Sequence, residues 1–300
     1  MTDLPDLFLA SPLAVTLIAE LEKRFHVHCE TPPPTTRAIV GSGMTRVDAA
    51  MVAALPALEI VAIQGVGYDG LDLAALRDRG VRVTTTPDVL SEDVADLAIA
   101  LMLAAERRIA ANDAVMRSGG WAVPFSRRAS GRRIGIFGLG RIGQAIARRA
   151  APFASEILYS ARHEKPELPW RFVADIGALA EACDVLVLAA PGGAGTRGIV
   201  GGAVLEKLGA DGVLVNIARG SLVDEPALIA ALSAGTIRGA GLDVFADEPH
   251  VSGVFREMDQ VVLSPHQASA TVECRAEMAA LVLANLDAHF AGKALVTPLA

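Results

Sequence analysis

The sequence predicts an α/β protein with parallel sheets, divided into two domains. Short apolar runs alternate with helical patterns almost throughout the 300 residues, which is typical of consecutive βα units. A chain of this length buries about three quarters of the surface of its unfolded form and favours about two domains. About 130 residues precede a glycine-rich turn at Gly138, enough for a domain of their own.

The composition excludes several classes of protein. The chain carries 27 Lys and Arg against 34 Asp and Glu, and a net charge of −7 argues against a nucleic-acid partner held through phosphates. The longest uncharged run, Leu7–Ala19, is too short to cross a membrane. Asp3 and Asp6 stand where a secretory signal carries positive charge, and three widely spaced cysteines fit neither a disulfide framework nor a zinc site. We therefore expect a cytoplasmic protein with no metal and no membrane partner.

The first third of the sequence predicts one series of strands and helices. Its apolar runs are short, and the stretches between them repeat apolar residues at helical spacing. The proline-rich segment Thr31–Thr36 is predicted to form a rigid turn. The predicted elements are, in order, the strand Arg37–Val40, the helix Val47–Ala54, the strand Leu58–Gln64, the helix Asp72–Arg79 and the strand Val81–Thr84.

A long helix is predicted soon after Pro87. Ser91 is a candidate N-cap, and Glu92 and Asp93 place negative charge where the N-terminus of a helix favours it. The apolar residues that repeat at helical spacing along it are Val94, Leu97, Ala98, Leu101 and Ala105.

A second series of strands and helices follows residues 117–133, which are polar, contain glycine and predict a loop. A last helical pattern runs from Met278 to Leu286 and is ended by Gly292. Six strands are predicted, as many as a complete dinucleotide-binding fold uses. They are Arg133–Phe137, Glu156–Tyr159, Val185–Ala189, Val213–Ile217, Ala240–Phe245 and Val261–Leu263.

The turn after Arg133–Phe137 has the glycine spacing of a dinucleotide site. Gly138 suits the tight turn, Gly140 lets the backbone approach a pyrophosphate, and Gly143 lets the helix pack closely on the strand. The start of that helix adds free N–H groups and a positive dipole end. A glycine-rich turn that merely tightens a corner is the alternative, but the flanking strand and helix favour the cofactor site.

The end of the next strand indicates which cofactor is bound. An acid that accepts from the ribose hydroxyls of NAD is expected about 20 residues after the motif begins, but residues 160–163 hold no carboxylate. Arg162 offers a guanidinium suited to the 2′-phosphate of NADP. We therefore expect NADP(H) to be preferred and NAD(H) to remain possible, with an ordinary surface arginine as the alternative.

Three polar residues follow late strands, where open α/β sheets place their ligands. Arg219 can hold a carboxylate through its fork of donors. His266 can donate a proton to an oxygen that becomes a hydroxyl, and Glu248 can bond the other ring nitrogen. Each residue alone has an ordinary structural explanation, and Asp247 is an alternative to Glu248 as the partner of His266. The three residues together with a cofactor motif favour reduction of a 2-oxo acid.

The chain resembles the D-isomer-specific 2-hydroxyacid dehydrogenases over nearly all of its length. It looks most like the branch of NADPH-preferring glyoxylate/hydroxypyruvate and hydroxyphenylpyruvate reductases, with which it shares the Ser160–Arg162 region and the segment Asn285–Lys293. The motifs that carry the family resemblance are Val66–Asp69, Thr85–Leu90, Glu92–Leu97, Gly138–Gly143, Asn216–Val223, Gly241–Pro249 and Pro265–Glu273.

This resemblance implies a Rossmann-type dinucleotide-binding domain, residues 100–286, inserted in a flavodoxin-like substrate domain made of residues 1–99 and 287–300. It implies Arg219, Glu248 and His266 as the catalytic set, and the backbone at Val66 and Gly67 as a second hold on the substrate carboxylate. A homodimer is also implied, with the Gly119–Arg128 loop as a candidate element of its interface. The implied cofactor contacts are Gly138, Leu139, Gly140, Arg141, Ile142, Gly143, Ser160, Arg162, Pro191, Thr196, Ile217, Asp243 and Ala268, with Asp243 accepting from the nicotinamide amide.

The expected function is therefore NADPH-preferring reduction of small 2-oxo acids, hydroxypyruvate and glyoxylate first, to D-2-hydroxy acids. Two alternatives remain open. One is a reductase of hydroxyphenylpyruvate or phenylpyruvate. The other is a non-catalytic, dinucleotide-sensing protein that resembles the corepressors built on this fold.

Overall fold

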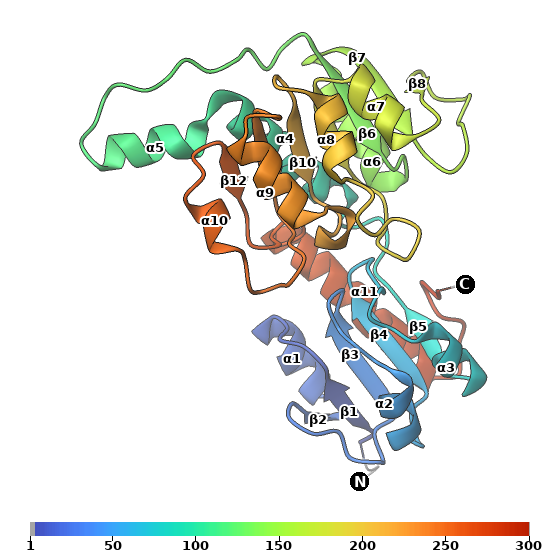
Figure 1. The fold of residues 1–300 in the computed structure, drawn as a ribbon. Helices are drawn as coiled ribbons and strands as arrows, with labels where there is room; N and C mark the ends of the chain where they lie inside the picture. Colours follow the sequence, from blue (N-terminus) through green and yellow to red (C-terminus); the bar gives the residue numbers. More distant parts are fainter. Residues whose placement is uncertain (1–3, 300) are drawn as a thin grey trace. The chain divides into compact units, whose positions relative to one another are not determined.

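The computed structural model describes residues 4–299, which form two parallel β-sheets with helices on both faces of each (Figure 1). The chain divides into two compact units. One combines the described residues up to Leu90 with those from Ala270 onward, and the other is Ser91–Ser269. The second unit therefore interrupts the first along the sequence, as predicted.

Two long helices lie where the domain boundaries were predicted. The expected boundaries, 99/100 and 286/287, fall inside α4 (Ser91–Arg107) and α11 (Val272–Phe290), whereas the two units meet at 90/91 and 269/270. α4 packs on strands of the second sheet, and α11 packs on β4 of the first. A whole helix therefore joins the unit in which it buries its apolar face.

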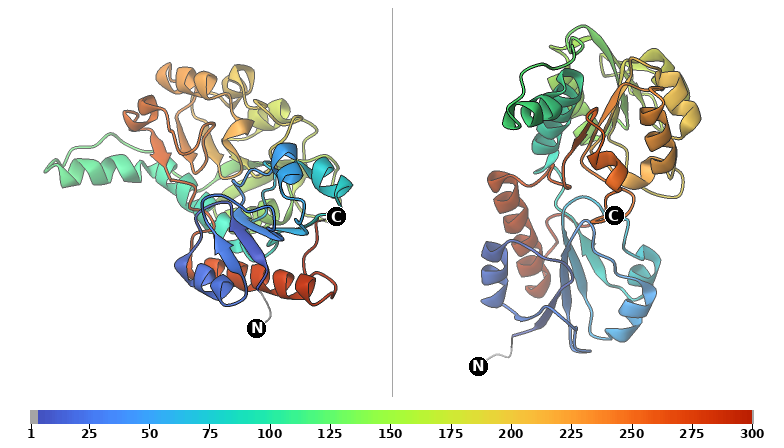
Figure 2. Two further views of the ribbon diagram at one scale, coloured as in Figure 1. Left: turned by 90° about the horizontal axis from the view of Figure 1, so that it is seen from below. Right: turned by 60° about the vertical axis from the view of Figure 1, so that its left-hand side comes forward.

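The first sheet has the strand order β2-β1-β3-β4-β5, which is the flavodoxin-like order that was predicted. Successive residues of β1 face opposite sides, so that Phe8 joins one buried cluster while Leu7 and Leu9 join the other. Figure 2 (right) shows α1 and α11 on one face of this sheet and α2 and α3 on the other. The elements besides α11 are β1 (Asp6–Leu9), α1 (Val15–Glu22), β2 (His26–His28), β3 (Ala38–Ser42), α2 (Ala49–Ala54), β4 (Ile60–Gln64), α3 (Leu73–Asp78) and β5 (Arg82–Thr84).

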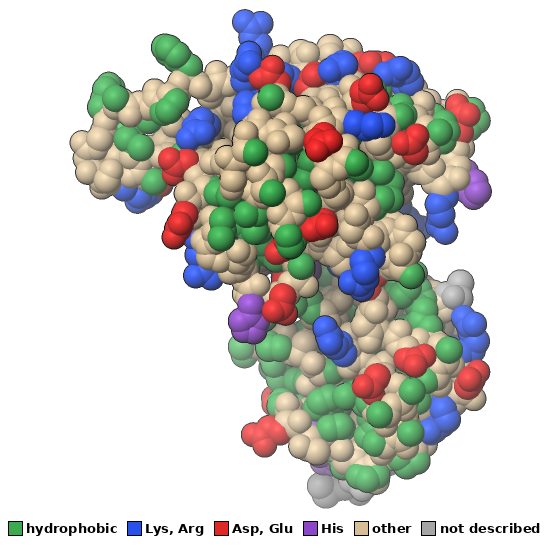
Figure 3. Space-filling model, in the orientation of Figure 1, with side chains coloured by type: hydrophobic (Ala, Val, Ile, Leu, Met, Phe, Trp, Pro, Cys, Tyr) green, Lys and Arg blue, Asp and Glu red, His purple; other side chains and the backbone are tan. Residues whose placement is uncertain are grey.

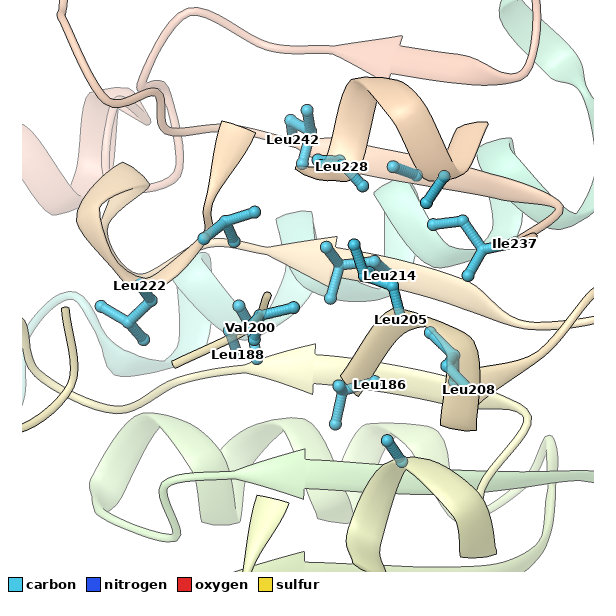
Figure 4. Packing of buried hydrophobic residues seen from close by; sticks show 14 of the residues in the cluster. Leu186, Leu188, Val200, Leu205, Leu208, Leu214, Leu222, Leu228, Ile237 and Leu242 are labelled. Atoms are coloured by element: carbon cyan, nitrogen blue, oxygen red, sulfur yellow. The ribbon is translucent and has the colours of Figure 1, made fainter. Parts of the chain in front are cut away.

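The second sheet has the order β12-β11-β10-β9-β6-β7-β8, so the direction of winding changes between β6 and β9. That is the point at which doubly wound sheets bind ligands. One face packs on α4 and α6, and the other carries a leucine-rich cluster with α7, α8 and α9 (Figure 4). The elements besides α4 are α5 (Ile109–Arg117), β6 (Arg132–Phe137), α6 (Arg141–Ala150), β7 (Ala154–Ser160), β8 (Arg171–Phe172), α7 (Ile176–Ala182), β9 (Val185–Leu188), α8 (Gly202–Leu208), β10 (Val213–Asn216), η1 (Gly220–Leu222), α9 (Glu225–Ser233), β11 (Gly239–Leu242), α10 (Gly253–Arg256) and β12 (Val261–Leu263).

Side-chain caps fix where several helices begin. The residue before the helix accepts a hydrogen bond from the third N–H of the first turn, which removes one of the unpaired donors at that end. The capping residues are Asp48 for α2, Asp72 for α3, Asp175 for α7, Asp224 for α9 and Thr271 for α11. At the other end of α11, Gly292 adopts a φ of +65°, which agrees with its predicted role as the helix stop.

The sequence prediction missed three elements before residue 37 and one late strand. β1, α1 and β2 precede the first predicted strand, and β8 pairs with only two residues of β7. Most of β1 and the first half of α1 lie within the uncharged run Leu7–Ala19, in which no charged residue separates the strand from the helix. Two smaller differences concern α4: Ser91 is its first helical residue and not its N-cap, and Arg108 with a φ of +54° separates α4 from α5.

The predicted site residues of the second unit lie at or beyond the ends of strands, at the same edge of the sheet. The glycine turn comes after β6, Arg162 after β7, Pro191 after β9, Arg219 after β10, Glu248 after β11 and His266 after β12. Parallel strands bring their carboxyl ends to one edge, so this placement follows from the topology. None of the helices in residues 4–299 is long and apolar enough to cross a membrane.

Candidate active site

The glycine turn after β6 leaves no room for side chains at two of its three glycines. Gly138 has a φ of +98°, and a Cβ there would lie 2.5 Å from the backbone nitrogen of Ala190. A Cβ on Gly143 would lie 2.1 Å from the carbonyl oxygen of Gly138. The first glycine therefore permits the turn beside the next strand, and the last permits close packing of α6, as predicted.

Gly140 differs from both because nothing lies within 4 Å of the position where its Cβ would stand. It is the residue before α6, and no side chain caps that helix. The first-turn amides of Arg141, Ile142 and Gly143 thus begin a helix next to open space. This arrangement fits the pyrophosphate of a dinucleotide, which needs backbone N–H groups and close approach. The side chain of Leu139 is buried, so only its backbone is available to a ligand.

The end of β7 lies beside this turn. Ser160 pairs with Phe137 in the sheet, and its carbonyl oxygen accepts from the Gly138 N–H at 2.8 Å. Ser160 is buried, whereas Arg162 is exposed, and no ion pair of Arg162 is found among the described residues. The structure therefore places a solvent-facing guanidinium two residues beyond a strand end that adjoins the glycine turn.

The loop after β9 is braced by its own threonine. The hydroxyl of Thr196 donates to the carbonyl oxygen of Pro191 at 3.0 Å, and Gly198 N–H donates to the carbonyl of Ser221 at 2.8 Å. These two hydrogen bonds give the loop a defined course.

Asn216 shapes the turn that carries Arg219. Its side-chain oxygen accepts from Ala218 N–H at 3.1 Å, and its amide nitrogen donates to the Arg219 carbonyl at 2.9 Å. The guanidinium of Arg219 donates to the carbonyl of Ala218 at 2.6 Å. Ile217, between them, is buried. The turn is therefore rigid on both sides of the arginine.

Gly220 brings this turn against the loop after β11. A Cβ on Gly220 would lie 1.9 Å from the carbonyl carbon of Phe245, so only glycine permits the approach. Two carboxylates then hold the second loop. Glu248 Oε1 accepts from Phe245 N–H at 2.9 Å, and Glu225 Oε1 accepts from Ala246 N–H at 2.6 Å.

Glu248 also bonds His266, through Oε2 and the ring nitrogen Nδ1 at 2.7 Å. Burial acts to raise the pKa of Glu248, but the hydrogen bond and charge of His266, the Phe245 amide and the charge of Arg219 lower it below its usual value. Glu248 is therefore a carboxylate at neutral pH. Asp247, its rival in the sequence, is 87% exposed and lies 4.0 Å from His250, so the structure selects Glu248 as the partner of His266.

Asp243 holds the loop that carries His266. Its buried carboxylate accepts from the Ser264 hydroxyl at 2.5 Å, from Gln267 N–H at 2.8 Å and from Ala268 N–H at 3.0 Å. His266 itself adopts a φ of +54°, a strained conformation for a residue with a side chain, and its N–H donates to the Asp243 carbonyl at 2.8 Å. This set of bonds, which we call the Asp243 clamp, stabilises the strained residue.

Residues 99–268 match the family model described as D-isomer specific 2-hydroxyacid dehydrogenase, NAD binding domain. The chain belongs to this family. It is an NAD(P)-dependent D-2-hydroxyacid dehydrogenase, and the predicted fold class and family are both confirmed.

Known members of the dehydrogenase family match nearly the whole chain. Glyoxylate/hydroxypyruvate reductase A of Arabidopsis thaliana is 46% identical, with 96% of each chain covered. Hydroxyphenylpyruvate reductase of Plectranthus scutellarioides is 45% identical, again with 96% of each covered. The crystal structure of an NADPH-dependent glyoxylate/hydroxypyruvate reductase from Sinorhizobium meliloti, in complex with NADP and malonate, is 40% identical with a TM-score of 0.93, and covers 99% of this chain and 97% of its own.

Val66 and Gly67, the residues of the first unit that were predicted to hold the substrate carboxylate, lie in the turn after β4. Gly65 has a φ of +148°, and its N–H donates to the Thr86 hydroxyl at 2.8 Å. Val66 and Gly67 follow, with Gly67 buried. The turn is thus held within the first unit, and its role toward a substrate of the dehydrogenase stays a prediction.

Several residues that shape this dehydrogenase site were not singled out from the sequence. Asn216 opens the recognised motif Asn216–Val223 and Ser264 immediately precedes the motif Pro265–Glu273, but nothing in the pattern separates a side chain that bonds a neighbouring loop from an exposed one. Glu225 follows the capping Asp224 in the first turn of α9. Its bond to Ala246 joins residues 21 positions apart, and only the fold brings them together.

Proposed function

We propose that the chain reduces small 2-oxo acids, hydroxypyruvate and glyoxylate first, to D-2-hydroxy acids, with NADPH as the preferred cofactor. The observation that carries the proposal is the 2.7 Å hydrogen bond between His266 Nδ1 and Glu248 Oε2, in loops that adjoin the Arg219 turn. Relatives named for glyoxylate and hydroxypyruvate support the substrate class.

In this mechanism Arg219 binds the substrate carboxylate through parallel N–H groups and draws electron density from the adjacent carbonyl. His266 holds Nδ1 toward Glu248, so Nε2 is the nitrogen that donates a proton to the carbonyl oxygen. Glu248 stabilises the protonated imidazole and fixes the orientation of the ring. The bound dinucleotide supplies the hydride. Val66 and Gly67 are assigned a second hold on the carboxylate through their backbone N–H groups.

The preference for NADPH rests on the composition of the β7–β8 loop. Arg162 supplies a charge-assisted bond to a 2′-phosphate, and residues 160–163 contain no carboxylate to accept from the ribose hydroxyls of NADH. The remaining predicted contacts, Leu139, Pro191, Thr196, Ile217, Asp243 and Ala268, line the same edge of the sheet and are assigned to the rest of the cofactor.

We also propose that the chain forms a homodimer, because α5 and the loop after it expose apolar side chains. No residue of α5 is buried, and apolar side chains project from this region (Figure 3). Trp121 is 84% exposed, and Phe125 is fully exposed. Monomers rarely leave such side chains in water. Light scattering of the wild-type protein should give the mass of two chains. The double variant Trp121→Ser with Phe125→Ser should give the mass of one chain. A wild-type protein with the mass of one chain would contradict the dimer.

The deciding experiment is a substrate panel with the purified protein. Hydroxypyruvate, glyoxylate, hydroxyphenylpyruvate and a 2-oxo sugar acid would each be assayed with NADPH and with NADH. We expect kcat/KM to be highest for hydroxypyruvate with NADPH. Apolar pockets separate substrates by only about 1–3 kcal/mol per methylene, so some turnover of larger acids is also expected.

Two results of the panel would overturn the proposal. A preference of more than about tenfold for hydroxyphenylpyruvate, a difference of about 1.4 kcal/mol in activation free energy, would favour the aromatic-acid reductase instead. Binding of NADPH without turnover of any acid would favour a dinucleotide-sensing protein.

A further inference from the structure

Tyr159 stands at the base of the loop that carries Arg162. It is the penultimate residue of β7 and is 1% exposed. Its ring lies against Phe172 of β8, with 5.5 Å between ring centroids. A buried tyrosine needs a partner for its hydroxyl, and here that partner comes from the loop itself.

The hydroxyl oxygen of Tyr159 accepts a hydrogen bond from the backbone N–H of Lys165 at 2.7 Å. At the other end of the loop, the Ser160 carbonyl accepts from Gly138 N–H at 2.8 Å. The short segment between Ser160 and Lys165 is therefore tied at both ends. Within it Arg162 is exposed, and the segment has no regular secondary structure of its own.

A loop that is ordered before binding loses less conformational entropy when its side chains meet a ligand. The only side-chain hydrogen bond found for the described loop between Ala161 and Pro169 is the one to Tyr159. We propose that the Tyr159 hydroxyl is a positioning group that holds the Arg162 loop beside the glycine turn, and so sets how strongly the protein distinguishes NADPH from NADH. This inference rests on the proposed role of Arg162 in reading the 2′-phosphate.

A purely structural role for the hydroxyl predicts something different. If the hydroxyl only satisfied a buried polar group, its loss would lower thermal stability and weaken both cofactors alike. A positioning role toward Arg162 weakens NADPH alone, because NADH has no 2′-phosphate for the guanidinium to bind. The ratio of the two dissociation constants separates the two roles.

The test uses Tyr159→Phe, which removes the hydroxyl and keeps the ring in the core. Dissociation constants for NADPH and NADH would be measured by titration calorimetry, together with the exchange rate of the Lys165 amide in the free protein. We expect NADPH to bind about three- to tenfold more weakly, the size of effect that one neutral hydrogen bond gives, and the dissociation constant of NADPH divided by that of NADH to rise by the same factor. The Lys165 amide should exchange faster in the variant.

Phe172→Leu is the matched control, because it disturbs packing against the same ring and leaves the hydroxyl in place. It should lower the melting temperature without changing the cofactor ratio. An equal rise in the ratio of the two dissociation constants for this control would overturn the proposal. An unprotected Lys165 amide in the wild-type protein would overturn it too, even if Tyr159→Phe failed to fold.

Arg162→Ala separates this inference from the proposed function. In that background Tyr159→Phe should cause no further loss of NADPH affinity, since the two act through one contact. An additional, equal loss would show that the hydroxyl acts independently of Arg162. If Arg162→Ala alone leaves NADPH affinity intact, the proposed cofactor preference is wrong. If it lowers that affinity and Tyr159→Phe does not, only the role of Tyr159 is wrong.

Discussion

The loops after β11 and β12 hold their polar side chains far more tightly than the loop after β7. The loops after β11 and β12 are joined by the hydrogen bond between Glu248 and His266 and by the Asp243 clamp. The carboxylate of Asp243 is fully buried. The β7–β8 loop is tied by one tyrosine hydroxyl, and its functional candidate, Arg162, is exposed.

This difference matches the tasks proposed for the two regions. Proton donation requires a ring nitrogen at a fixed distance and angle from the reacting oxygen, so His266 needs a rigid surround. Recognition of an additional phosphate requires only that a long, charged side chain reach a strong acceptor. The strained φ of His266 shows that the fold tolerates local strain where the loops are over-determined.

The largest effect should come from the rigid region. His266→Ala removes the proposed acid, and kcat should fall by about 100- to 10,000-fold, the range for a positioned acid or base. NADPH affinity should change little, because the phosphates are assigned to the glycine turn. Steady-state kinetics with a fluorescence titration of NADPH checks both, and near-normal turnover would refute the role of His266.

Glu248→Gln should lower kcat by about 10- to 100-fold, because a neutral amide no longer stabilises the protonated imidazole. Rate–pH profiles would show the decline of reduction starting at lower pH in the variant. An unchanged profile would mean that Glu248 only shapes its loop.

The lowered pKa of Glu248 also predicts how stability depends on pH. A carboxyl whose pKa is depressed in the folded state stabilises the fold above the usual carboxyl pKa, and this contribution disappears as the pH falls through the folded-state value. Denaturant unfolding of wild-type protein should therefore lose free energy in acid more steeply than Glu248→Gln. Parallel curves for the two proteins would contradict the shift.

In the loosely held region, Arg162→Ala should raise the KM for NADPH about tenfold and leave the KM for NADH almost unchanged, as expected when one charge-assisted hydrogen bond is lost. Initial rates with both cofactors at saturating substrate provide the measurement. Equal losses with NADPH and NADH would mean that Arg162 supports the loop and does not read the phosphate.

The smallest effect should come from loss of the Ser264 hydroxyl, which donates to the Asp243 carboxylate. Ser264→Ala removes one of the three donors to the Asp243 carboxylate, and kcat should fall about three- to tenfold as the His266 loop loosens, in line with the loss of one hydrogen bond. Ser264→Thr keeps the hydroxyl and should restore turnover. A threonine variant as slow as the alanine variant would show that packing, and not the hydrogen bond, is what matters there.

Much of the second unit could be predicted from the sequence because its signals are local. The six predicted strands of this unit correspond to β6, β7 and β9 to β12. The different needs of Gly138 and Gly143 follow from sterics within one turn, and the structure agrees with them. By contrast β1, α1 and β2 were not predicted, and tertiary packing stabilises β1 and α1 through the buried Leu7, Leu17 and Leu21.

The sequence by itself determined the α/β class, the dinucleotide turn and the three loops that carry Arg219, Glu248 and His266, since strand periodicity and glycine sterics act between near neighbours. Only the tertiary structure decided between Asp247 and Glu248, adjacent acids of which one is exposed and the other bonds His266. It alone joined Ser264 to Asp243 and Lys165 to Tyr159. Such hydrogen bonds join residues from different strands and loops, and the sequence pattern does not show which of these lie next to one another in the folded chain.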